Sequence, residues 1–129
     1  MPRKASDRPT DVELEILNAL WELGPSSVGE VHERLKAQRS TGYSTTLKMM
    51  QVMHQKGLLT RDESSRPQKY RTAASRQKTQ AQLVDHLIRS AFGGAAGKLL
   101  VRALARKRIR PDELAEIKHL IERLERGEK

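Results

Sequence analysis

The chain has 129 residues, of which 36% are hydrophobic and 32% charged, so it fits one domain or two small ones and carries enough apolar residues to fold. Its 25 lysine and arginine residues against 16 acidic residues give a net charge of +9, which favours an acidic partner such as nucleic acid or an anionic membrane. Cysteine is absent, which excludes disulfides, thiol nucleophiles and thiolate metal sites and is compatible with the reducing cytoplasm, where we expect the protein to act.

Neither export nor membrane insertion is expected. The first ten residues are basic but precede no apolar run, unlike a signal peptide or an anchor. Residues 83–104 form the longest stretch with few charges, yet a spanning helix there would carry charged side chains into hydrocarbon, namely Asp85, Arg89, Lys98 and Arg102. We therefore expect a soluble protein.

The first predicted helix covers residues 11–23. Thr10 and Glu13 form a capping-box pattern at its start, in which the hydroxyl and the carboxylate each accept from a backbone amide. Apolar residues then recur at helical spacing, and Gly24 followed by Pro25 ends the helix.

Two further helices are predicted before residue 57. Ser27 and Glu30 repeat the capping-box pattern and indicate a short helix over about residues 28–35. Ser44 is expected to cap a third helix over about residues 44–56. One side of that third helix carries a set expected to join the core: Thr46, Met49, Met50 and Met53.

A hairpin is predicted after the third helix. Residues 58–61 and 69–72 have the composition of short strands, and residues 62–68 between them are rich in turn formers and charges. Three helices followed by a hairpin make a winged helix-turn-helix, in which the third helix enters the major groove of DNA and the hairpin contacts the backbone.

Polar and basic side chains of the third helix and the hairpin are the candidate DNA contacts. They comprise Ser44, Thr45, Leu47, Lys48 and Gln51 on the helix and Arg61, Arg66, Gln68 and Lys69 on the wing. Leu47 either packs under the wing or meets a thymine methyl group. A solvated helix surface gives the same pattern for Lys48 and Gln51.

Charge is unevenly divided over this first part of the chain. Residues 10–33 contain six acids and no lysine or arginine, whereas residues 34–71 contain nine basic residues and two acids. We expect about seven net positive charges to form an electrostatic footprint for a polyanion, with the acidic first helix facing away. The alternative is that the basic run is only a solvated face.

Three more helices are predicted in residues 75–129. Ser75 can cap a fourth helix, which Gly93 and Gly94 stop, and a fifth covers about residues 96–106. Pro111 suits the first turn of the last helix. In that helix the spacing of three, four and three residues makes a heptad seam of Leu114, Ile117, Ile121 and Leu124.

No catalytic or metal site is predicted, and no cofactor is expected. The four histidines, which are His32, His54, His86 and His119, do not lie within one turn of each other and have no dense acid cluster beside them. Neither a G-x-S-x-G motif nor a phosphate-binding loop occurs. We therefore expect a protein that is not an enzyme.

The motifs as a set resemble the penicillinase repressor family of bacterial transcription regulators, the BlaI, MecI and CopY type. The resemblance spans about residues 10–124 and rests on TDVELEILNALWELGPSSVGEVHERL, YSTTLKMMQVMHQKGLL, RPQKYRTAAS and FGGAAGKLLVRAL. It implies a homodimeric repressor that binds a short inverted-repeat operator. The helices of the carboxy-terminal part are then expected to pair the subunits, through Val84, Leu87, Ile88, Leu114, Ile117, Ile121 and Leu124.

The sequence departs from both ways in which members of this family are relieved of repression. In one branch a membrane sensor system leads to cleavage within the fifth helix, commonly between asparagine and phenylalanine, and the corresponding pair here is Arg102 and Ala103. The other branch uses a cysteine cluster, which this chain lacks. A sensor or protease partner is therefore an expectation from the resemblance alone.

The fifth predicted helix also has an unusual charge pattern. Residues 98–110 contain six basic residues and no acid, and Lys98, Arg102 and Arg106 recur every fourth residue on one helix face. Acidic side chains of a partner subunit or DNA can neutralise this face; the alternative is that it is only a solubilising face.

These observations predict a mainly α fold with two parts: a winged helix-turn-helix over residues 1–74, including a short basic amino-terminal tail, and a three-helix dimerisation region over residues 75–129. The predicted function is repression by a homodimer bound to double-stranded DNA. The alternative is a winged-helix interaction module that recognises an acidic protein. Single-stranded RNA binding is disfavoured because only four residues are aromatic, and membrane-surface binding because no basic amphipathic helix carries aromatic anchors.

Overall fold

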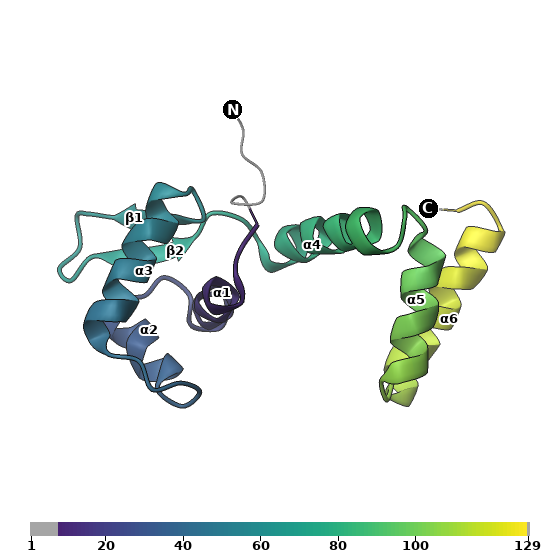
Figure 1. The fold of residues 1–129 in the computed structure, drawn as a ribbon, viewed down its shortest axis with the longest axis horizontal. Helices are drawn as coiled ribbons and strands as arrows, with labels where there is room; N and C mark the ends of the chain where they lie inside the picture. Colours follow the sequence, from purple (N-terminus) through teal and green to yellow (C-terminus); the bar gives the residue numbers. More distant parts are fainter. Residues whose placement is uncertain (1–7, 129) are drawn as a thin grey trace. The chain divides into compact units, whose positions relative to one another are not determined.

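The computed structural model describes residues 8–128 and has the predicted, mainly helical architecture. In chain order its elements are α1 Asp11–Leu23, α2 Val28–Leu35, α3 Tyr43–Gln55, β1 Leu59–Asp62, β2 Lys69–Thr72, α4 Arg76–Ala91, α5 Ala96–Arg106 and α6 Pro111–Glu125 (Figure 1). Most of the expected basic amino-terminal tail, residues 1–7, lies outside the described residues. Within residues 8–128 no helix is long and apolar enough to cross a membrane.

Local sequence signals set the starts of the first two helices. Thr10 Oγ1 accepts from the Glu13 amide at 3.2 Å, and the Glu13 carboxylate accepts from the Thr10 amide at 2.9 Å. Ser27 and Glu30 form the same reciprocal pair at the start of α2. Gly24 has a φ of 82°, a conformation that favours glycine, so α1 ends where the sequence predicts.

The predicted cap of α3 is wrong. The helix begins at Tyr43 with Gly42 as its N-cap residue, and Ser44 lies exposed inside the first turn. The Gly42 carbonyl accepts from the Thr46 amide at 3.2 Å, which closes the first turn of the helix. Because Thr46 is only 1% exposed, burial of this residue fixes where the helix starts, and no side-chain cap is formed.

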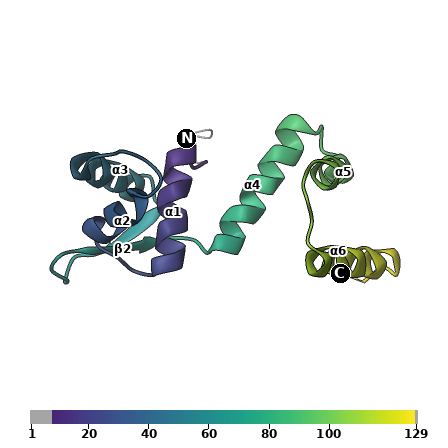
Figure 2. The ribbon, with the colours of Figure 1, turned by 90° about the horizontal axis from the view of Figure 1, so that it is seen from below.

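One hydrophobic core holds α1, α2, α3 and the hairpin together, and Figure 2 shows the same elements from below. Its members come from every one of these elements: Ile16, Leu17, Ala19, Leu20, Val28, Val31, Leu35, Met50, Met53, Leu59 and Tyr70. Each buried aliphatic side chain contributes about 1.5–3 kcal/mol to stability, so this cluster supplies the main driving force for folding. Of the expected α3 set, Met49 is only partly buried.

The hairpin is a two-stranded antiparallel sheet with Leu59 opposite Thr72 and Asp62 opposite Lys69. Its second strand is also pinned to the segment between α1 and α2. Tyr70 and Ser26 exchange both backbone hydrogen bonds, at 2.7 and 2.9 Å, and Tyr70 is itself buried. The three helices followed by this anchored hairpin form a winged helix-turn-helix, as the sequence predicts.

The chain divides into two compact units, the first ending at Val84 and the second beginning at Asp85. This division falls inside α4, ten residues beyond the start of the region assigned to dimerisation from the sequence. In the first unit, the Trp21 indole donates to the Ala74 carbonyl at 3.2 Å and the Arg76 guanidinium lies over the indole ring, which ties the start of α4 to α1.

The second unit has no core of its own. Across residues 85–128 no side chain is buried, although α5 and α6 are both amphipathic. The most exposed large apolar residue is Val101, at 66%, and it is accompanied by Leu87, Leu100, Leu114, Leu120, Ile121 and Leu124. Apolar faces this open are unusual for a folded monomer.

Two long-range ion pairs hold the ends of α3. At its carboxyl end, Lys56 Nζ contacts both oxygens of Glu13, at 2.8 and 3.0 Å, and the Glu13 side chain is only 7% exposed. Before its amino end, Arg39 makes a two-pronged contact with Glu15, with both distances 2.8 Å. This contact lowers the pKa of Glu15, first through the hydrogen bond from Arg39.

Replacing Glu13 tests how strongly α3 is tied to α1. Glu13→Ala is expected to lower the free energy of unfolding by about 2–3 kcal/mol, because it removes a cap and leaves a half-buried ammonium without its partner. Urea unfolding followed by fluorescence of Trp21, the single tryptophan, measures this unit. The control Glu33→Ala, which removes an exposed pair with Lys36, is expected to change stability by less than about 0.5 kcal/mol. Equal effects of the two variants would contradict the importance assigned to Glu13.

Candidate nucleic-acid interface

The outer face of α3 presents most of the helix residues that the sequence assigns to DNA. Thr46, Met50 and Met53 are buried on the inner face, so the helix cannot rotate without opening the core. Four of the five predicted helix contacts are exposed on the opposite side, and these are Ser44, Thr45, Lys48 and Gln51. An ammonium and an amide one turn apart can bond phosphates or base edges.

Leu47 packs against the core. It is half-buried and contacts the hydrophobic cluster, which is the first of the two roles expected for it. It also lines a groove between α3 and the wing together with Gln51, Gln68, Pro67 and Tyr70. The structure thus brings together two predicted polar contacts from different elements, Gln51 and Gln68, beside an apolar floor.

Arg61 is bound within the wing. Its guanidinium donates to the Glu63 carboxylate at 2.8 and 3.1 Å and to the Tyr70 hydroxyl at 3.4 Å, and it lies 5.8 Å from the centre of the Tyr70 ring. The hydrogen bond to Tyr70, followed by that to Glu63, raises the pKa of Arg61. Because its charge is already paired, Arg61 is a weaker candidate for a phosphate than the sequence indicates.

Arg66 braces the turn at the tip of the wing. Its Nη1 donates to the carbonyls of Glu63 and Ser65, at 2.8 and 2.9 Å, while the side chain stays exposed. The same turn is held by Asp62, whose carboxylate accepts from the amide and hydroxyl of Ser64. The hydrogen bond from the Ser64 hydroxyl is the main cause that lowers the pKa of Asp62.

Three further cations of this surface, Lys48, Lys69 and Arg71, are exposed. None of the three forms a salt bridge within residues 8–128. The backbone hydrogen bond from Ser27 is the main cause that lowers the pKa of Glu30, and the positive charge of Lys69 lowers it further, so Lys69 lies near the start of α2. Arg71 was not among the residues that the sequence singled out, yet it lies on the same strand as Lys69.

The expected footprint of about seven net charges is an overestimate. Five of the nine basic residues between positions 34 and 71 form ion pairs, four of them with acids of α1 and α2: Arg34 with Glu22, Lys36 with Glu33, Arg39 with Glu15, Lys56 with Glu13 and Arg61 with Glu63. Much of the basic run therefore neutralises the acidic first helices. The cations left for a polyanion are Lys48, Arg66, Lys69 and Arg71.

Tyr43 is a surface residue that the sequence did not assign to the site. It is 51% exposed in the first turn of α3 and lines the groove between α3 and the wing. Its ring meets the His32 ring edge to face at 6.0 Å, and His32 Nδ1 lies 3.4 Å from Thr46 Oγ1. The sequence signal was its position next to the polar start of the third helix.

The remaining predicted positions lie on α4, α5 and α6. Val84, Leu87, Leu114, Ile121 and Leu124 are exposed, and Ile88 and Ile117 are half-buried. Arg102 and Ala103, the pair that the sequence resemblance places at the cleavage position, are both exposed on α5. Among the described residues no group of three or more histidine or acidic side chains is placed to hold a metal ion.

Comparison with known proteins finds proteins that are similar to this chain. It is 29% identical over 119 residues to the transcriptional regulator BlaI of Mycobacterium tuberculosis, in strains CDC 1551 / Oshkosh and ATCC 25618 / H37Rv, covering 91% of this chain and 85% of that protein. A MarR family protein from Bacillus stearothermophilus is similar in structure, with a TM-score of 0.45 and 17% identity, over 98% of this chain and 76% of that one.

The family model of the penicillinase repressor matches residues 9–123, which is nearly the whole chain. Both the family and the matched relatives are transcriptional regulators. The protein is therefore a DNA-binding transcriptional regulator, not an enzyme, and it belongs to the penicillinase repressor family.

Proposed function

We propose that this regulator represses transcription by occupying an inverted-repeat operator as a homodimer. In this proposal α3 lies in the major groove and the hairpin lies along the phosphate backbone. The observation that carries the proposal is the two-faced α3: its inner face is locked by Thr46, Met50 and Met53, which leaves Lys48 and Gln51 exposed. Gln51 also lines a groove with Pro67 and Gln68 of the wing.

Two features of the second unit support a dimer. No side chain in residues 85–128 is buried, and α6 carries the seam of Leu114, Ile117, Ile121 and Leu124 along one side. A second copy would cover this seam by an isologous contact, and two copies related by a two-fold axis match an inverted repeat. The proposed roles of Val84, Leu87 and Ile88 follow from the same argument.

The experiment that tests the proposal is selection of bound sequences from a random pool of DNA duplexes at about physiological salt. The affinity for the most enriched sequence is then compared with the affinity for a scrambled duplex. An inverted repeat bound about a thousandfold or more above scrambled DNA is expected. Binding without enrichment would show that the protein binds DNA without sequence preference. Binding of an acidic protein in place of DNA would favour the interaction-module alternative.

The α3 contacts are tested by Lys48→Ala and Gln51→Ala. Each is expected to lower the preference for the operator, Gln51→Ala by about 1–3 kcal/mol if its amide reads a base edge. The fold should not change, because both side chains are exposed. Gel-shift titrations with operator and scrambled DNA measure the preference, and Gln38→Ala, an exposed amide outside α3, is the control. Equal losses on both DNAs would assign the two residues to the backbone.

The wing cations are expected to differ from one another. Lys69→Ala should weaken operator and scrambled DNA alike and reduce the slope of log affinity against log salt by about one, since it removes a phosphate contact. Arg61→Ala should change that slope less, because the Arg61 guanidinium is already paired with Glu63. Affinity measured across a salt series compares the two variants, and equal slopes for both would refute the distinction.

The α6 seam is tested by Ile117→Asp combined with Ile121→Asp. The double variant is expected to be a monomer that binds the operator poorly, because two carboxylates would have to be buried in the interface. Sedimentation equilibrium gives the oligomeric state. The matched control is Ala115→Asp with His119→Asp, which adds the same charge to exposed positions off the seam and should leave the dimer intact. A seam variant that stays dimeric would rule out this interface.

A further inference from the structure

The cations of α5 lie along one face of the helix without an acidic neighbour. Lys98, Arg102 and Arg106 are all exposed and recur every fourth residue, about 6 Å apart along the axis. None of them forms an ion pair within residues 8–128. Since like charges at this spacing repel each other, the face gains stability from any carboxylates placed along it.

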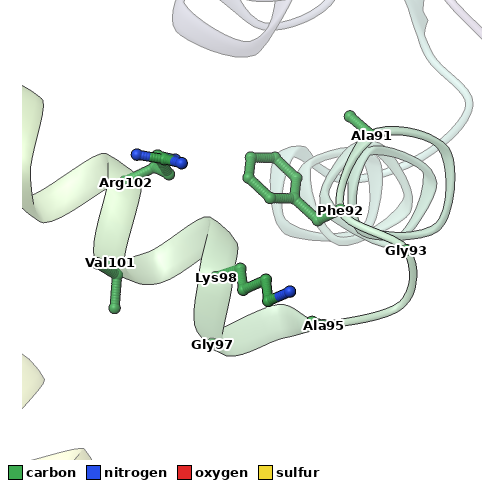
Figure 3. Close-up of a pocket in the computed structure, with 8 residues that line it drawn as sticks. All are labelled: Ala91, Phe92, Gly93, Ala95, Gly97, Lys98, Val101 and Arg102. Carbon is green, nitrogen blue, oxygen red and sulfur yellow. The ribbon is translucent and has the colours of Figure 1, made fainter.

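Two of these cations also flank an apolar groove inside the second unit. The groove lies between the carboxyl end of α4 and α5, and its lining includes Phe92, Ala95, Lys98, Val101 and Arg102. Figure 3 shows the Phe92 ring projecting toward α5, with Lys98 and Arg102 extending on the same side as the ring. An occupant that fits this groove has apolar residues bordered by carboxylates.

The last helix has this chemistry. Pro111–Glu125 contains five acids and two basic residues, a net charge of −3, whereas Ala96–Arg106 contains three basic residues and no acid, a net charge of +3. Glu113 and Glu116 are exposed, lie on one side of α6 at a spacing of three residues, and border its apolar seam. Asp112 is instead paired with Arg110.

We propose that the basic face of α5 is bound by α6 of a second copy, with Lys98 and Arg102 of one subunit paired with Glu113 and Glu116 of the other. By symmetry the contact occurs twice in the dimer. The inference rests on the homodimer proposed above and identifies what makes that dimer specific: the apolar seam supplies affinity, and the two charged faces select the partner and its register.

The connection between the two helices keeps Lys98 away from the first turns of α6 in the same chain. Only residues 107–110 join α5 to α6, and the helices run in opposite directions (Figure 1). Lys98 is at the start of α5, whereas Glu113 and Glu116 are at the start of α6. Because the helices are antiparallel, these two starts lie at opposite ends of the helix pair. Within one chain neither Glu113 nor Glu116 forms an ion pair with a described residue. A second copy can bring the opposite ends together.

Charge exchange between two variants tests the pairing. One variant is Lys98→Glu with Arg102→Glu, and the other is Glu113→Lys with Glu116→Lys. Each alone places like charges at both symmetry-related contacts, so its homodimer should dissociate about tenfold more readily than that of the unmodified protein. In an equimolar mixture both contacts become attractive, so heterodimers should form with close to the original affinity. Sedimentation equilibrium with one variant fluorescently labelled measures each species.

Two further variants guard against misfolding and general charge effects. The chain carrying all four substitutions should form homodimers again, which a variant that had lost its fold could not do. Lys107→Glu with Arg108→Glu makes the same change of net charge in the adjoining connection and should dimerise like the unmodified protein. The unmodified dimer should also weaken as salt rises.

The outcomes separate this pairing from the dimer itself. An unmodified protein that is monomeric would overturn both the proposed function and this inference. A dimeric protein whose variants show no rescue on mixing would overturn the pairing alone. If Lys98→Glu with Arg102→Glu dimerised normally and lost DNA affinity, these cations would face DNA and the pairing would be wrong.

Discussion

The buried face of α3 is the constraint on which the DNA-binding unit depends. Thr46, Met50 and Met53 have almost no exposed surface, so the helix has one permitted rotation about its axis. Successive residues of an α-helix are rotated by about 100°, so Lys48 and Gln51 point away from the side that carries the core residues. The pairs Lys56 with Glu13 and Arg39 with Glu15 fix the two ends of the helix against α1. The surface proposed to contact DNA is therefore positioned by the core residues beneath it.

The two units obtain their stability in different ways. In the first, residues from α1, α2, α3 and both strands close a single core, and the backbone pairing of Tyr70 with Ser26 secures the wing to it. In the second, the helices satisfy their own backbone hydrogen bonds but leave their apolar stripes uncovered. Helices of 11 and 15 residues gain little stability without packing. In the proposed homodimer, a second copy would cover these stripes, so folding of this half would be coupled to dimerisation.

Much of the fold could be predicted because its signals are local. The capping boxes at Thr10 and Ser27, the glycine after α1 and the proline of α6 all act within a few residues of the boundary they set. The start of α3 was missed because burial of Thr46 decides it, and burial depends on residues far along the chain. For the same reason the ion pairs across 24 and 43 residues could not be predicted, and the free positive charge was overestimated. The exposure of Ser44, Thr45, Lys48 and Gln51 on α3 follows from helical spacing alone. The pairing of Arg61 with Glu63 and the exposure of Tyr43 required the structure.

The concentration of methionine on α3 has a consequence for oxidative chemistry. The chain has no cysteine, and three of its four methionines, Met49, Met50 and Met53, belong to this one helix. A sulfoxide at Met50 or Met53 would place a polar oxygen in the core directly beneath the face of α3 that is proposed to contact DNA. Because both thioethers are fully buried, peroxide reaches them only when the unit opens, so their rate of sulfoxide formation reports how often it opens. If α3 binds the operator as proposed, DNA binding would stabilise the closed unit, and DNA-bound protein would be oxidised more slowly than free protein.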